Sequence, residues 1–216
     1  MSSAKNPLWD IPTRVCHWLF VIVVGFSWWS AENDHLDWHT WSGYALLVLV
    51  TFRIVWGFVG SQSARFSYFL RSPTLVWAYA KSLLKRETHP SKGHNPMGAW
   101  SVVLLLSAIL IQVVLGLFTE DVDGLASGPL SYLVSYDTAR LAAEVHEEFF
   151  SVLMLLVTLH IVFIFYYLFY KRENLIKPMF TGVKANIDSS DLVQAPLWRA
   201  ALILLVIIAG VWWLVS

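Results

Sequence analysis

Residues 146–170 read HEEFFSVLMLLVTLHIVFIFYYLFY. After Glu148 this stretch has no charged residue before position 171, so its 22 apolar or uncharged residues are long enough to cross a membrane as an α-helix. His146 and His160 are 14 residues apart, which is about 21 Å along a helix axis and returns almost to the same face. The sequence therefore predicts one helix that presents two imidazoles at two depths of a bilayer.

The composition of the whole chain points to the same class. In 216 residues, 57% are hydrophobic, 14% are charged and 12 are Trp, and the mean hydropathy is +0.59. This is typical of an all-α integral membrane protein. The net charge of zero gives no field that would attract nucleic acid. Cys16 is the single cysteine, which excludes an internal disulfide, a four-cysteine iron–sulfur site and covalent haem attachment.

Five stretches are candidates for transmembrane helices, and the fifth is C-terminal to a group of four. The second reaches the length of a span only if Arg53 lies inside it, over residues 41–60. The first follows Trp9, Asp10 and Pro12 rather than a short basic region, so we expect a retained helix and not a signal peptide. A short helix is expected within residues 71–93, and residues 184–196 form a polar linker. The uncharged stretches are residues 15–31, 38–52, 93–119, 149–170 and 200–216.

Basic residues are distributed unevenly over the predicted loops. The N-terminal segment and residues 61–92 and 171–196 hold twelve Lys and Arg residues. The other two loops hold Arg140 alone, beside Glu32, Asp34, Asp37, Glu120, Asp121, Asp123, Asp137 and Glu144. By the positive-inside rule the N-terminus is predicted to be cytoplasmic and, after five spans, the C-terminus periplasmic. Tryptophans at the predicted span ends agree with an interfacial aromatic belt.

Two further histidines match the depths of the first two. His17 begins the first span on the cytoplasmic side, level with His160, and His39 begins the second span on the outer side, level with His146. One histidine at a span end is more often a packing residue, but two depth-matched pairs predict two b-type haems, each bound non-covalently between two imidazoles. Such iron has no open position, which favours electron transfer. His35, His89 and His94 are predicted to be solvated loop residues.

Four other residues are predicted to contribute to cofactor binding. Arg53 follows His39 by 14 residues, so it shares that face near the cytoplasmic pair, where a haem propionate would compensate its charge. Arg14 lies one turn before His17. For both arginines the alternative is snorkelling to lipid phosphates. Gly43 and Gly116 would let a porphyrin approach the backbone, although glycine is also common in membrane helix packing.

The motifs then show a family resemblance. The first motif is Trp9-Asp10-Ile11-Pro12-Thr13-Arg14, which leads to His17-Trp18. The later motifs, in chain order, are Trp38-His39, Gly43-Tyr44, Phe52-Arg53, Trp56-Gly57, Gly93-His94-Asn95-Pro96 and the pair His146 and His160. Over residues 8–183 the chain resembles the bacterial cytochrome b561 family, which includes the cytochrome b subunit of nickel–iron hydrogenases. The resemblance implies a four-helix bundle in the bacterial inner membrane that binds two haems b, through His17 with His160 and His39 with His146. It also implies electron exchange between a periplasmic protein and the quinone pool.

These expectations divide the chain into a di-haem bundle, residues 1–183, and a linker with a C-terminal helix, residues 184–216. The predicted function is electron transfer across the membrane between quinone and a periplasmic partner such as a cytochrome c or a hydrogenase. The candidate groups on the quinone side are Arg53, Asn95 and His94. The first alternative is a superoxide:quinone oxidoreductase, which the acidic outer loops disfavour. The second is a non-haem transporter or structural subunit whose histidines relay protons or bind a metal ion.

Overall fold

The structure is a computed structural model, and it describes residues 7–83, 93–122, 127–184, 187 and 189–216. Five of its helices are long and apolar enough to cross a membrane, and the described residues contain no β-strand. The predicted all-α membrane class is therefore confirmed. The spanning helices are α1 (Ile11–Glu32), α2 (Leu36–Val59), α5 (Pro96–Leu117), α6 (Tyr136–Phe169) and α8 (Leu197–Val215). Shorter elements are η1 (Gln62–Ala64), α3 (Phe66–Phe69), α4 (Pro73–Ser82), η2 (Ser131–Leu133) and α7 (Ile176–Thr181).

Capping residues explain where the helices begin. The Asp10 carboxylate accepts a hydrogen bond from the Thr13 backbone N–H at 2.9 Å, so α1 begins at Ile11, before the uncharged stretch. The Asn95 side chain caps α5 in the same way. Helix α6 begins 13 residues earlier than the uncharged stretch at Phe149, with Ser135 as its N-cap. It is about 51 Å long, so it extends beyond a hydrocarbon core of about 30 Å.

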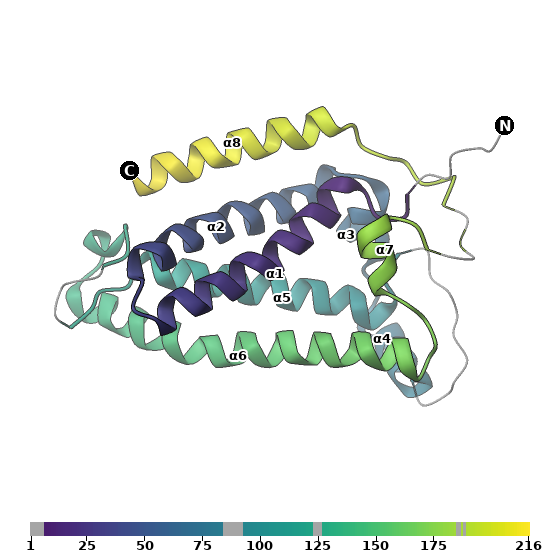
Figure 1. The fold of residues 1–216 in the computed structure, drawn as a ribbon, viewed down its shortest axis with the longest axis horizontal. Helices are drawn as coiled ribbons and strands as arrows, with labels where there is room; N and C mark the ends of the chain where they lie inside the picture. Colours follow the sequence, from purple (N-terminus) through teal and green to yellow (C-terminus); the bar gives the residue numbers. More distant parts are fainter. Residues whose placement is uncertain (1–6, 84–92, 123–126, 185–186, 188) are drawn as a thin grey trace.

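The spanning helices form a four-helix bundle with α8 on its outside (Figure 1). Helix α1 packs against α2, α2 against α5, and α5 against α6, while α8 lies along α2. Leu46, Val50, Ile109, Val113 and Leu153 belong to the main core, between α2, α5 and α6. Helix α6 packs closely against α5 and only sparsely against α1 and α2 within the described chain. The backbone of α6 therefore lies farther from the α1–α2 hairpin than from α5, and larger side chains fill the interval.

The two ends of the bundle have opposite charge, and we name them for it. The acidic end carries the α1–α2 turn, the described part of the segment after α5 and the first turns of α6. In the sequence, residues 32–38 and 118–148, of which 123–126 lie outside the described residues, hold ten acidic residues and one basic residue, Arg140. The basic end carries α3, α4, α7 and the start of α1 and α8 (Figure 1). In the sequence, residues 1–14, 60–95 and 170–199, of which 1–6, 84–92, 185–186 and 188 lie outside the described residues, hold thirteen basic and five acidic residues.

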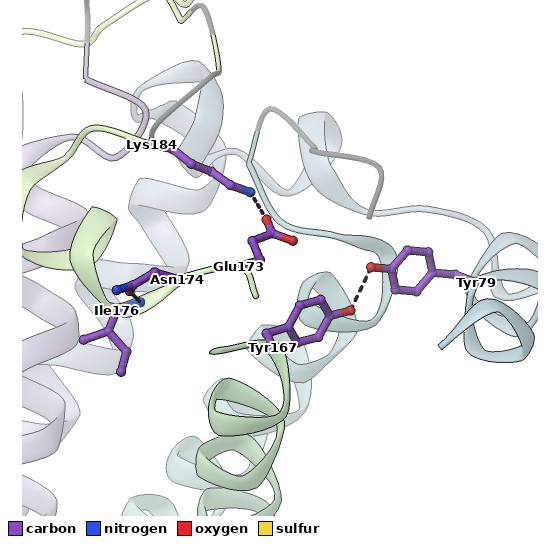
Figure 2. A network of polar contacts seen from close by, with 6 residues as sticks. All are labelled: Tyr79, Tyr167, Glu173, Asn174, Ile176 and Lys184. Carbon is purple, nitrogen blue, oxygen red and sulfur yellow. Dashed lines mark hydrogen bonds and ion pairs between the residues drawn. The ribbon is translucent and has the colours of Figure 1, made fainter. Parts of the chain in front are cut away.

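Short helices and polar contacts cover the basic end. Helix α4 confirms the short helix predicted within residues 71–93, and it is held to α6 by a hydrogen bond of 2.7 Å between the hydroxyls of Tyr79 and Tyr167. An ion pair of 2.5 Å joins Lys184 to Glu173 just after α6 (Figure 2). The first contact joins α4 to the end of α6, and the second joins two positions of the chain that follows α6.

Candidate functional site: two histidine pairs

The first pair lies near the acidic end, where His39 of α2 faces His146 of α6. Their ring centroids are 6.0 Å apart and their planes are nearly perpendicular, at 87°. The two imidazoles therefore meet between α2 and α6. The sequence predicted that these residues share a depth, and the structure places them side by side.

Backbone carbonyls fix the orientation of both rings in this pair. His39 Nδ1 is 2.9 Å from the carbonyl oxygen of Ser27, and His146 Nδ1 is 2.9 Å from that of Gln112. Because a carbonyl only accepts, each Nδ1 carries the proton and donates it, which leaves each Nε2 as a lone pair for a metal. The Gln112 side-chain amide donates in return to the His146 carbonyl at 2.8 Å. Bonds of this kind orient metal-binding histidines in many proteins.

The two predicted glycines have different surroundings. A Cβ atom on Gly116 would be 3.0 Å from Cε1 of His146, so the bare backbone of α5 gives room to the imidazole itself. A Cβ atom on Gly43 would have no atom within 4 Å. Gly43 therefore borders open space one turn beyond His39, and Gly116 leaves room for the His146 ring; their predicted contact with a porphyrin stays a prediction.

The second pair lies toward the basic end, where His17 of α1 faces His160 of α6. Their ring centroids are 6.4 Å apart, with the planes at 53°. Nδ1 of His17 is buried without a hydrogen-bond partner among the described residues. Within the same part of the chain, no hydrogen bond to His160 is found. This pair matches the first in separation but has no carbonyl acceptors.

Both separations fit a metal held between two imidazoles. Metal–nitrogen bonds of about 2 Å on opposite sides of one ion place the ring centroids about 6 Å apart. Among the described residues no group of three or more His, Cys, Asp or Glu side chains could hold a metal ion. Each pair therefore offers two imidazoles that could hold the metal of a macrocycle from two sides.

Unpaired buried polar atoms gather at the basic end. Seven buried side-chain nitrogen or oxygen atoms have no hydrogen-bond partner in the described chain, and six of them lie at this end. Arg53 is 5% exposed, and its Nη1 is among the six; among the described residues its one hydrogen bond is a 3.4 Å contact from Nη2 to the Ala64 carbonyl. Buried donors without acceptors are costly, so this region suits a group that brings carboxylates, such as the propionates of a haem. The six atoms are Thr13 Oγ1, Arg14 Nε, His17 Nδ1, Arg53 Nη1, Ser63 Oγ and His94 Nδ1.

The prediction that His94 is a solvated loop residue is wrong. Its ring lies between Trp9, at a centroid distance of 4.5 Å, and Phe69, at 4.6 Å. Burial, with smaller contributions from Arg53 and from the two histidines of the basic-end pair, lowers the pKa of His94 to about 3. The imidazole is therefore neutral at physiological pH. His35 is exposed, in agreement with its prediction, and His89 lies outside the described residues.

Arg14 and Asp10 join the segments that surround the basic-end pair. Arg14 donates from Nη1 to the Phe180 carbonyl of α7. Asp10 is buried, and besides capping α1 it accepts a hydrogen bond from the Trp56 indole of α2 at 2.9 Å. The sequence analysis used Asp10 to argue against a signal peptide and for the family resemblance, and it did not identify Asp10 as a helix cap. An acidic residue directly before a proline-containing first turn is the signal that could have identified it as a cap.

The fold and the site together define a multi-pass membrane protein with two opposed histidine pairs in one bundle. The profile of the family described as Prokaryotic cytochrome b561 matches residues 8–182, and the chain belongs to this family. It is therefore a membrane b-type cytochrome of electron transport, and the family implies that it binds haem b. Neither a curated protein nor a solved structure matches the chain. Helix α8 lies outside the matched residues.

Proposed function

We propose that this cytochrome binds two haems b, one between His39 and His146 and one between His17 and His160, and carries electrons through the bilayer between them. The observation that supports this most strongly is the pair of centroid separations, 6.0 Å and 6.4 Å, at two levels of one helix. Haem b would supply a one-electron iron couple. The four imidazoles would hold the two irons in pairs and leave no open position for oxygen or other small ligands.

The arginines have a separate role in this proposal. Arg53 and Arg14 carry unpaired buried N–H groups beside the basic-end pair, and they would neutralise and hold carboxylates there. Gly43 and Gly116 leave room for the macrocycle and for the His146 ring. Residues 1–183 would form the di-haem unit, and the linker and α8, residues 184–216, would cover α2, against which α8 packs.

The charges support an orientation and a class of partner. We place the basic end on the cytoplasmic side of a bacterial inner membrane, with the N-terminus inside and the C-terminus in the periplasm. The periplasmic end then holds ten acidic residues and Arg140. A redox protein with a basic surface, such as a small cytochrome c, would be steered to such a face. A superoxide anion would be repelled by it, so superoxide oxidation is not favoured.

The electron acceptor or donor at the opposite end would be a quinone in the bilayer. Arg53 and His94 are buried polar groups beside the basic-end pair, and Asn95, which caps α5, lies next to His94. A quinone that approaches this end would exchange electrons with the His17–His160 site. Its protons would be exchanged with the cytoplasm.

Quantification of haem tests the proposal. The pyridine haemochrome assay should give two haems b per chain for the wild type and one each for His146→Ala and His160→Ala. His35→Ala, which changes an exposed histidine near the same end as His146, is the matched control and should keep both. A wild type without haem, or with one haem that survives both substitutions, would contradict the proposal.

A further inference from the structure

A polar pocket lies at the basic end, where the segment after α2 meets the chain before α8. Its volume is about 410 Å³, and its lining residues are Gln62, Arg65, Ser67, Tyr68 and Val193. Two hydrogen bonds join the segments that form it. The Gln62 backbone N–H donates to the Val193 carbonyl at 2.9 Å, and the Val193 N–H donates to the Gln62 side-chain oxygen at 3.1 Å. None of these residues belongs to the histidine pairs or to the groups proposed around them.

The side chains in this pocket offer donors and no anionic group. Because the Gln62 side-chain oxygen already accepts a backbone N–H, its amide nitrogen is left to donate. Arg65 uses Nε for the Gly60 carbonyl, at 2.8 Å, and neither of its Nη groups forms a hydrogen bond within the described chain. The hydroxyls of Ser67 and Tyr68 have no protein partner among the described residues either. The pocket therefore suits an anion with several acceptor oxygens.

Two arginines place positive charge beside the pocket. Arg65 binds the Gly60 carbonyl and Arg199 binds the Val59 carbonyl, at 3.2 Å, so both guanidinium groups lie at the C-terminal end of α2. The carbonyls of a helix C-terminus together carry only about half a negative charge. No ion pair to either arginine is found in the described part of the chain. The remaining positive charge is available to a bound anion.

The surroundings favour a lipid as the source of that anion. The pocket lies where α2 ends and α8 begins, and both helices are candidate spans, so its level is that of the membrane surface. Phe58 is exposed, and its ring centroid is 5.3 Å from that of Phe66, which directly follows Arg65. Trp198, at the start of α8, is exposed as well, as is usual at a membrane interface. Exposed apolar side chains beside a cationic pocket match the two parts of a phospholipid.

We infer that this pocket binds the phosphate group of an anionic phospholipid. The Arg65 guanidinium donates from its Nη groups to the phosphate oxygens, and the Gln62 amide and the Tyr68 hydroxyl donate beside it. The lipid connects the segment after α2 with the linker before α8, since both segments line the pocket. The inference does not depend on haem at either histidine pair, because it uses none of their residues.

Native mass spectrometry of the full chain in detergent tests the inference. The probes, added separately, are dioleoylphosphatidylglycerol, dioleoylphosphatidylcholine and inorganic phosphate. The wild type should bind phosphatidylglycerol more tightly than phosphatidylcholine. Arg65→Gln should weaken the binding of phosphatidylglycerol about tenfold, because charge-assisted hydrogen bonds are lost. Arg71→Gln, which removes an exposed arginine outside the pocket at the same end, is the matched control and should keep the wild-type affinity.

A second variant keeps the test decisive if Arg65→Gln does not fold. Tyr68→Phe combined with Ser67→Ala removes two hydroxyls and leaves the packing of the Tyr68 ring in place, and the affinity for phosphatidylglycerol should fall about threefold. Equal affinity in the wild type and the pocket variants, or equal binding of the two lipids, would overturn the inference. Displacement of phosphatidylglycerol by millimolar inorganic phosphate would assign the pocket to a free phosphate and overturn the lipid as its ligand.

Discussion

The two histidine pairs share α6 and nearly the same separation, yet they are supported in different ways. At the acidic end, carbonyls of α1 and α5 orient both imidazoles before any ligand is present. At the basic end, buried groups such as Arg53 Nη1 and His17 Nδ1 lack partners within the described chain. The acidic-end pair is thus preorganised by the backbone, whereas the basic-end pair depends on the group it binds. Similar ligand geometry does not imply similar stability or similar redox behaviour.

The largest effect is expected from a substitution at Gly116, on the backbone of α5 that lies against the acidic-end pair. Gly116→Val places a branched side chain where even a Cβ atom would be 3.0 Å from the His146 ring. The ring must move, its bond to the Gln112 carbonyl is lost, and haem retention at the acidic end should fall by about tenfold or more. The measurement is the haem-to-protein ratio after purification. Gly210→Val on α8, where no atom lies within 4 Å, is the control and should retain both haems. Equal ratios in the two variants would contradict the role given to Gly116.

A smaller effect is expected from Asp10 near the basic-end pair. Asp10→Ala removes the cap of α1 and leaves the buried Trp56 indole N–H without its acceptor. The expected loss of stability is about 2 kcal/mol, measured as a lower Tm in detergent. Glu144→Ala, which removes an exposed carboxylate from α6, should change the Tm little. If both variants melt at the same temperature, the link from α1 to α2 through Asp10 is not important for stability.

The contact between α4 and α6 at the basic end should contribute less to stability than Asp10 does. Tyr79→Phe deletes the hydroxyl that bonds to Tyr167 (Figure 2), and we expect a loss of about 1 kcal/mol with no change in haem content. Thermal melting measures the loss of stability, and the haem-to-protein ratio measures the haem content. The control is Tyr132→Phe at the acidic end, where the side chain is 76% exposed. Loss of a haem in Tyr79→Phe would show that α4 supports the site directly.

The smallest effect concerns the surface of the acidic end. The double variant Glu147→Gln, Glu148→Gln removes two exposed carboxylates next to His146, and it should slow reduction by a basic redox protein about twofold at low ionic strength. The difference should disappear at high salt, because both charges are then screened. Stopped-flow reduction measures it, with Glu173→Gln at the basic end as the control. A rate that is independent of salt in the wild type would rule out electrostatic steering.

Much of this arrangement could be predicted from the sequence, because it follows from length and spacing. Uncharged stretches predict spans, and the 14-residue interval between His146 and His160 predicts one face at two depths. The start of α6 at Tyr136 could not be predicted from the charge-free stretch, because such a stretch marks the apolar part of a helix and not its caps. The roles of Ser27 and Gln112 could not be predicted, since their backbone carbonyls bond across helices and leave no residue pattern. His94 was misassigned because its burial depends on Trp9 and Phe69, which are distant in sequence.

The most direct test of the central claim is electron paramagnetic resonance of the fully oxidised protein at low temperature. Iron held between two imidazoles is six-coordinate and low-spin, so the account predicts two distinct low-spin ferric signals. One should disappear in His146→Ala and the other in His160→Ala. A high-spin signal from intact wild-type protein, or a single low-spin signal that neither substitution changes, would contradict the assignment of the two histidine pairs.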